Sequence, residues 1–134
     1  MKEEIKILLS FLTTSSPDVL ITPCDLMKEE WIEEIKAESI KCTSIKCKEE
    51  DKNCITMHPT GMYLPMKRFD IWIIDPEYFP YTPGYAFYLG NSAMKQFGII
   101  ALTSLPDDSM DSVALSYGFQ ILHHGSWHYY LKSS

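Results

Sequence analysis

Two histidines spaced four residues apart are the residues of this sequence best suited to metal chemistry. His124 and His128 lie in residues 108–131, where apolar side chains recur every three or four positions and predict a buried helix. On a helix, this spacing places both imidazoles on one face, from which two nitrogens can hold zinc at about 2.0–2.1 Å. We therefore take His124 and His128 as candidate zinc ligands, with histidines that bind no ligand as the alternative.

The residue that follows the first histidine decides whether such a site could hydrolyse a peptide. In the H-E-x-x-H motif this residue is a glutamate, which polarises the metal-bound water and moves its proton. Here the position is occupied by Gly125, which offers no group for proton transfer. A replacement base would have to come from Glu77, Asp107 or Asp111.

The elements that would position this site predict one α+β domain over residues 1–134. Helices are expected near the N-terminus and at 26–39, and the last helix is expected at 108–131, buried against the sheet. Strands are expected at 19–22, 70–74, 85–89 and 98–103, with a further one within 39–47. This order predicts a mixed β-sheet covered by helices.

The overall composition excludes several classes of function. A net charge of -6 and a pI near 5.1 argue against direct binding of nucleic acid. No apolar run reaches the length of about 20 residues that a membrane helix needs, and glutamates occupy the positive region of a signal peptide. We therefore expect a cytoplasmic protein. No glycine-rich phosphate loop and no G-x-S-x-G motif is present.

The four cysteines leave three alternatives. Cys24, Cys42, Cys47 and Cys54 form no C-x-x-C pair, and a chain of this size does not need cross-links. Free thiols are the expectation. A small structural zinc site that includes Cys54 and His58, and a set of disulfides, remain the other two possibilities.

The C-terminal half of the sequence resembles the archaemetzincins and related minimal zinc peptidases. The resemblance covers residues 70–131. The matching positions are Phe87, Gly90, Ala93, residues 100–105, His124, His128 and Leu131. It implies a zincin-like fold with a zinc helix and a metallopeptidase ancestry.

The departures from that family imply a degenerate site. Gly125 replaces the glutamate, Tyr130 stands where the family has glycine, and no third zinc ligand follows His128. The resemblance therefore implies a pseudoenzyme with weak or lost zinc, which acts by binding a protein partner and for which Trp127 and Tyr130 are the candidate binding residues. An active zinc peptidase with another base and an unrelated α/β interaction module are the alternatives.

Overall fold

A seven-stranded mixed sheet forms the centre of the protein. The computed structural model describes residues 2–133. The strands are β1 (Asp18–Thr22), β2 (Ser39–Ser44), β3 (Cys54–Thr56), β4 (Phe69–Ile74), β5 (Met94–Leu102), β6 (Phe119–His124) and β7 (His128–Lys132). They lie in the order β3-β2-β1-β4-β5-β7-β6; β1 to β5 are parallel, and β7 is antiparallel to both β5 and β6. The mixed sheet covered by helices is confirmed, in an α/β arrangement.

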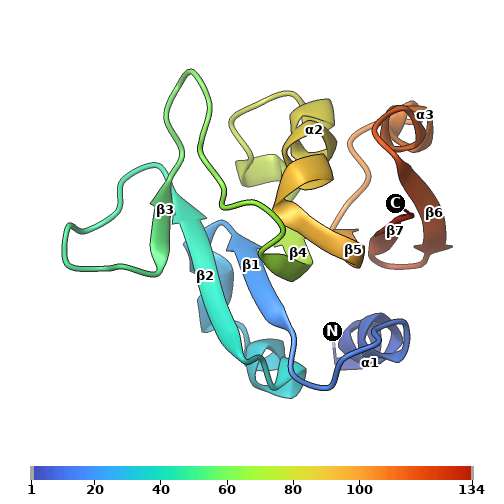
Figure 1. Ribbon diagram of the computed structural model, residues 1–134, viewed down its shortest axis with the longest axis horizontal. Helices are drawn as coiled ribbons and strands as arrows, with labels where there is room; N and C mark the ends of the chain where they lie inside the picture. Colours follow the sequence, from blue (N-terminus) through green and yellow to red (C-terminus); the bar gives the residue numbers. More distant parts are fainter. Residues whose placement is uncertain (1, 134) are drawn as a thin grey trace.

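Helical segments cover both faces of this sheet (Figure 1). They are α1 (Lys2–Ser10), η1 (Cys24–Lys28), η2 (Glu30–Ile35), η3 (Pro76–Tyr78), α2 (Pro83–Ala93) and α3 (Met110–Ser116), where η marks a 3-10 helix. α1 and η2 pack on one face, and α2 and α3 pack on the other. Among residues 2–133, no helix combines the length and the apolar composition needed to cross a membrane.

The central strands β1 and β4 are apolar along almost their whole length because both of their faces are buried. Val19 and Ile71 point toward α1 and η2, whereas Leu20 and Trp72 point toward the side of α2, and all four are fully buried. Near-continuous apolar runs are typical of parallel strands covered on two faces. The predicted strands at 19–22, 70–74 and 98–103 are confirmed by β1, β4 and β5.

The connections that leave β1 and β4 diverge. The chain passes from β1 to β2 through η1 and η2, with η2 packed on one face, and from β4 to β5 through α2 on the other face. In an open parallel sheet, such a divergence opens a crevice beyond the carboxyl ends of the two strands, and ligands bind there.

Two predicted elements are wrong. Residues 85–89 lie inside α2, which begins at Pro83 after Thr82; a proline at the first helical position favours a helix start. The buried C-terminal helix over 108–131 does not form: α3 ends at Ser116, Gly118 adopts a left-handed conformation with φ of 86°, and β6 and β7 follow as a hairpin. The predicted helix at 26–39 is two 3-10 helices.

The hairpin predicts unequal effects for two neighbouring apolar residues. Phe119 is fully buried against Phe87, whereas Ile121 is 43% exposed. Phe119→Ala should lower the free energy of unfolding by about 3–5 kcal/mol through lost burial and a cavity. Ile121→Ala should cost no more than about 1 kcal/mol. Urea unfolding of both variants tests this, and equal losses would contradict the hairpin.

An ionic cluster of Asp18, Arg68, Asp70 and Lys95 closes the opposite, amino-terminal end of the central strands. Lys95 Nζ lies 2.9 Å from Asp18 Oδ2 and 3.1 Å from Asp70 Oδ2, and Arg68 Nη1 lies 3.0 Å from Asp18 Oδ1. Burial by itself would raise the pKa of Asp18, but hydrogen bonds from Ser39, Lys95 and Arg68 outweigh it and lower the pKa from 3.8 to about 2.

The lowered pKa of Asp18 predicts a pH-dependent contribution to stability. A carboxyl group whose pKa falls on folding stabilises the fold above its unfolded pKa, and that contribution is lost as the pH falls through the folded pKa. Asp18→Asn should therefore cost about 2 kcal/mol at pH 7, and the difference from the unmodified protein should shrink between about pH 4 and pH 2. Urea melts across this range test it, with the exposed Glu33→Gln as control. A constant difference would contradict the ion-pair account.

Candidate functional site

A crevice lies beyond the carboxyl ends of β1, β2, β3 and β4, where the diverging connections of β1 and β4 are expected to leave one. Its volume is about 660 Å³, within the range of small-molecule sites. The wall is formed by the segments that follow each of these strands: Pro23, Asp25, Leu26 and Glu29 after β1, Ser44 and Ile45 at the end of β2, Met57 after β3, and Asp75, Glu77, Tyr78, Phe79 and Pro80 after β4.

Hydrogen bonds hold the floor of the crevice together. The backbone N–H of Asp75 donates to the carbonyl of Thr22 at 2.8 Å, which extends the pairing of β1 and β4 to the crevice. The buried Thr22 hydroxyl accepts hydrogen bonds from Trp72 Nε1 at 2.8 Å and from Thr43 Oγ1 at 2.9 Å. These contacts join β1, β2 and β4 directly beneath the wall residues, so the site rests on rigid strands.

The crevice is acidic. Its wall carries the carboxylates of Asp25, Glu29, Asp75 and Glu77, and its described lining residues include no lysine, arginine or histidine. Asp75 Oδ1 accepts a hydrogen bond from the Glu77 backbone N–H at 3.2 Å, which orients its side chain. Such a wall favours cationic groups and hydroxyl donors, and it repels phosphates.

The loop after β1 adds a second restriction on the ligand. Dinucleotide sites on related sheets use glycines there, because the backbone must approach the pyrophosphate closely. In this chain the segment reads Pro23, Cys24, Asp25, and the first glycine of the whole sequence is Gly61. The ligand must therefore be recognised mainly by side chains.

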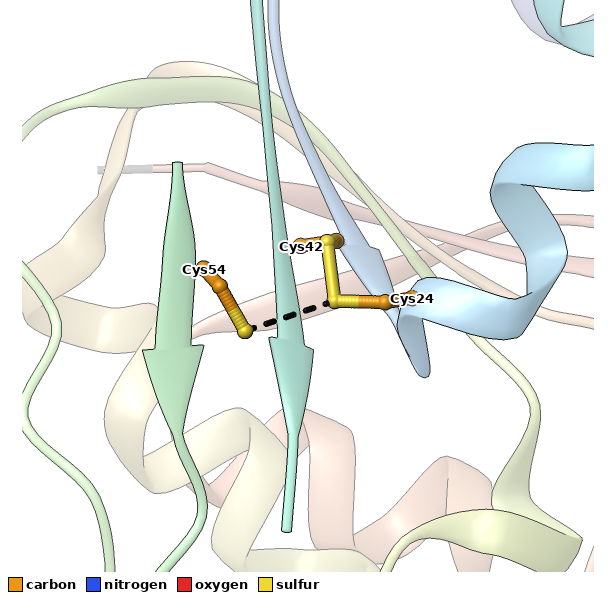
Figure 2. Close-up of side chains that lie close together, drawn as sticks. All are labelled: Cys24, Cys42 and Cys54. Atoms are coloured by element: carbon orange, nitrogen blue, oxygen red, sulfur yellow. Dashed lines mark hydrogen bonds between the residues drawn. A yellow bond between two sulfur atoms is a disulfide. The ribbon is translucent and has the colours of Figure 1, made fainter. Parts of the chain in front are cut away.

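The cysteines lie beside this crevice and are paired. Cys24 is bonded to Cys42 and Cys47 to Cys54, so the expectation of free thiols is wrong and the alternative of disulfides is the observed state. Figure 2 shows the side chain of Cys54 on β3 directed toward the Cys24–Cys42 bond, with a distance of 3.7 Å between the sulfurs of Cys24 and Cys54.

His124 and His128 do come together, but on a hairpin instead of a helix. They face each other as the last pair of β6 and β7, with 2.6 Å between their Nδ1 atoms. This distance is that of a hydrogen bond, shorter than the separation of about 3.3 Å between two nitrogens that bind one zinc ion. The Nε2 atom of His124 lies 3.1 Å from Asp111 Oδ1. Desolvation and the neighbouring His124 lower the pKa of His128, which favours its neutral form. Their role as metal ligands stays a prediction.

Both candidate binding aromatics belong to the core. Trp127 is 2% exposed and packs edge-on against Trp31, and Tyr130 is fully buried, with its hydroxyl donating to Asp111 Oδ1 at 2.8 Å. Neither ring is available at the surface for a partner. The backbone N–H of Trp127 donates to the buried Glu4 carboxylate at 2.7 Å, which fixes α1 to the hairpin. Binding of a protein partner stays a prediction, but the buried rings of Trp127 and Tyr130 do not provide its contact surface.

The proposed replacement bases are spread over the fold. Asp111 contacts His124 and Tyr130, Asp107 is exposed and accepts hydrogen bonds from Ser109, and Glu77 lines the acidic crevice. Gly125 occupies the hairpin turn, where a Cβ would meet His123 Nε2 at 2.8 Å. Any larger side chain there would have to displace the His123 ring, and the position lies on a hairpin turn and not on a zinc helix.

Comparison with solved structures identifies the fold. The sequence matches no protein-family model and no curated protein. The similar structures are predominantly methyltransferases. A 1,6-didemethyltoxoflavin-N1-methyltransferase from Burkholderia thailandensis, solved with S-adenosylhomocysteine, matches with a TM-score of 0.65 at 9% identity, over 99% of this chain and 76% of that one. The fold is that of these methyltransferases.

Two further similar structures show that the shared fold is not limited to methyltransferases. An S-adenosylmethionine-dependent methyltransferase from Mesorhizobium loti has a TM-score of 0.62 at 11% identity, over 88% of this chain and 81% of that one. The cyclase SpnF also has a TM-score of 0.62, at 12% identity, over 91% of this chain and 58% of that one. The same fold therefore carries more than one chemistry.

These findings overturn the resemblance to archaemetzincins. Neither a zincin-like fold nor a zinc helix is present in residues 2–133, so the interpretation as a degenerate metallopeptidase is wrong, as is that of an active zinc peptidase. Binding to another protein stays a prediction. The crevice was missed because its residues come from four separate strand ends. Asp75-Pro76-Glu77 directly after a buried strand was the signal that could have indicated it.

The disulfides predict a defined response to reduction. Cys24 and Cys42 are 18 residues apart, and a cross-link that closes a loop of about this length contributes about 3 kcal/mol. Non-reducing peptide mapping should recover the pairs 24–42 and 47–54. In the presence of a metal chelator, Cys42→Ser should lower the free energy of unfolding by about 3 kcal/mol under oxidising conditions and change it little under reducing conditions. Other pairings, or the same loss in both conditions, would contradict the assignment.

Proposed function

We propose that this chain is a methyltransferase-type domain that binds S-adenosylmethionine or S-adenosylhomocysteine in the acidic crevice. The observation that carries the proposal is the position of the four carboxylates at the divergence between β1 and β4, in the fold of enzymes that use such ligands. When bound, S-adenosylmethionine supplies a methyl group activated by a sulfonium centre.

The residues of the crevice fit the chemistry of this ligand. S-adenosylmethionine carries no phosphate, so the acidic wall does not repel it as it would a nucleotide. It carries one carboxylate against two positive groups, the sulfonium and the ammonium, so its net charge is positive, and its ribose hydroxyls are hydrogen-bond donors. Asp25 and Glu29 on the β1 side, with Asp75 and Glu77 on the β4 side, are acceptors for these groups.

The apolar part of the wall suits the adenine ring. Leu26, Ile45, Met57 and Phe79 provide aliphatic and aromatic surface, and Tyr78 is 58% exposed beside them. Aromatic and apolar walls with a few placed polar groups are typical of nucleoside sites. A phosphorylated nucleotide would place its negative charge against four carboxylates and is disfavoured.

Calorimetry with the two S-adenosyl compounds tests the proposal. We expect both to bind, and we expect adenosine monophosphate to bind far more weakly because of its phosphate. The double substitution Asp75→Asn and Glu77→Gln should weaken binding by at least about 10-fold, since each charge-assisted contact contributes about 1.5 kcal/mol or more.

A matched control separates local contacts from net charge. Glu33→Gln with Glu34→Gln makes the same change in charge outside the crevice and should leave the affinity unchanged. Equal weakening by both pairs of substitutions, or tighter binding of adenosine monophosphate than of S-adenosylhomocysteine, would contradict the proposal.

A further inference from the structure

Four cysteines, two on neighbouring strands and two on the segments that follow β1 and β2, come together next to residues of the crevice wall. Cys42 on β2 and Cys54 on β3 are register partners, Cys24 lies in η1 directly after β1, and Cys47 lies in the loop between β2 and β3. The sulfurs of Cys24, Cys42 and Cys54 all lie within 4.8 Å of one another. Among the described residues 2–133, no other three histidine, cysteine, aspartate or glutamate side chains come together at this spacing.

The closest approach between the two disulfides matches the geometry of a thiolate metal site. Four sulfurs around zinc at about 2.3 Å are separated by about 3.8 Å at the corners of a tetrahedron. The sulfurs of Cys24 and Cys54, which belong to different disulfides, are 3.7 Å apart (Figure 2). These two side chains therefore already have the spacing of two zinc ligands.

We propose that the reduced form of this protein binds one Zn²⁺ ion through Cys24, Cys42 and Cys54, with Cys47 as the fourth ligand. Once the disulfides are reduced, each bonded pair of sulfurs must separate to the spacing that Cys24 and Cys54 already have, and the sulfurs of Cys24, Cys42 and Cys54 start within 4.8 Å of one another. Cys47 lies on an exposed loop whose neighbours are all at the surface, so it can adjust without disturbing the core.

Zinc and the two disulfides exclude each other. Two molecules of a dithiol reductant together give four electrons and four protons to the two disulfides, which yields four thiols, and each reductant molecule becomes a disulfide. Zinc then binds the four thiolates, and the four thiol protons are released to solvent. Two molecules of a disulfide oxidant reverse the sequence: they take four electrons from the thiolates and four protons from solvent, the two protein disulfides re-form, and the ion is released.

The surroundings suit a site of this charge. All four cysteines are partly buried, so an ion can reach the sulfurs while the protein restricts their motion. Lys41 lies within the same segment and its Nζ is 3.4 Å from the carbonyl of Lys52, and Lys46 and Lys48 flank Cys47. Positive charge near thiols favours the thiolate, which is the form that binds metal. Glu49, Glu50 and Asp51 oppose this on the outer part of the loop.

Cobalt titration of the reduced, metal-free protein tests the proposal. Under anaerobic conditions with a non-thiol reductant, Co²⁺ should produce the visible absorption and the thiolate charge-transfer band of tetrahedral cobalt at one ion per chain. Zn²⁺ should abolish the signal, and the oxidised protein should show none. A reduced protein without these bands overturns the proposal.

Variants distinguish this site from the histidine pair. Cys24→Ser and Cys54→Ser should lose the cobalt signal, whereas His124→Ala with His128→Ala should keep it. Loss in the histidine variant and retention in the cysteine variants overturns the proposal.

Protection from alkylation gives a second readout that does not depend on how the variants fold. In the reduced, unmodified protein, zinc should slow the alkylation of Cys24, Cys42 and Cys54, as measured residue by residue by mass spectrometry. Equal alkylation rates with and without zinc also overturn the proposal.

Discussion

The pairing of β1 with β4 is the constraint on which the rest of the structure depends. Both strands are buried on both faces, and their register from Val19–Ile71 to Thr22–Ile74 fixes where each ends. Their connections leave toward opposite faces, so the wall residues cannot close over the gap. The hydrogen bond from the Asp75 N–H to the Thr22 carbonyl extends this pairing to the floor of the crevice. The crevice thus follows from strand order before any wall residue is considered.

The residues that line the crevice determine which kinds of ligand it can bind. A glycine-rich turn would present backbone N–H groups to a phosphate. This chain instead follows β1 with Pro23 and Cys24, and Cys24 is cross-linked to Cys42 on β2. The segment after β1 is therefore held close to the sheet. In place of backbone N–H groups, this wall presents carboxylates to a ligand. Fold and charge together favour a cationic nucleoside over a nucleotide, a distinction that the fold alone does not make.

The sequence predicts the strands better than the segments that distinguish this fold from others. β1, β4 and β5 could be predicted because burial on two faces produces apolar runs bounded by turn residues. Residues 85–89 are all apolar or aromatic although Tyr88 of α2 is 58% exposed, and such a run does not distinguish helix from strand. The spacing of His124 and His128 fits one helical turn and also fits a tight hairpin that brings them opposite each other. The crevice depends on strand order, which local patterns do not contain.

The cysteine cross-links stabilise the edge of the sheet at β2 and β3, where little other packing is available. Two parallel neighbours are usually joined by a crossover of a dozen or more residues containing a helix, which buries apolar surface against the sheet. β2 and β3 are joined only by residues 45–53, a charged and largely exposed loop, and β3 has three residues. Little burial holds this edge, so covalent or metal links between Cys24, Cys42, Cys47 and Cys54 take the place of the missing helix. Asp25 lines the β1 side of the crevice and directly follows Cys24, so the Cys24–Cys42 disulfide also anchors this part of the wall to β2.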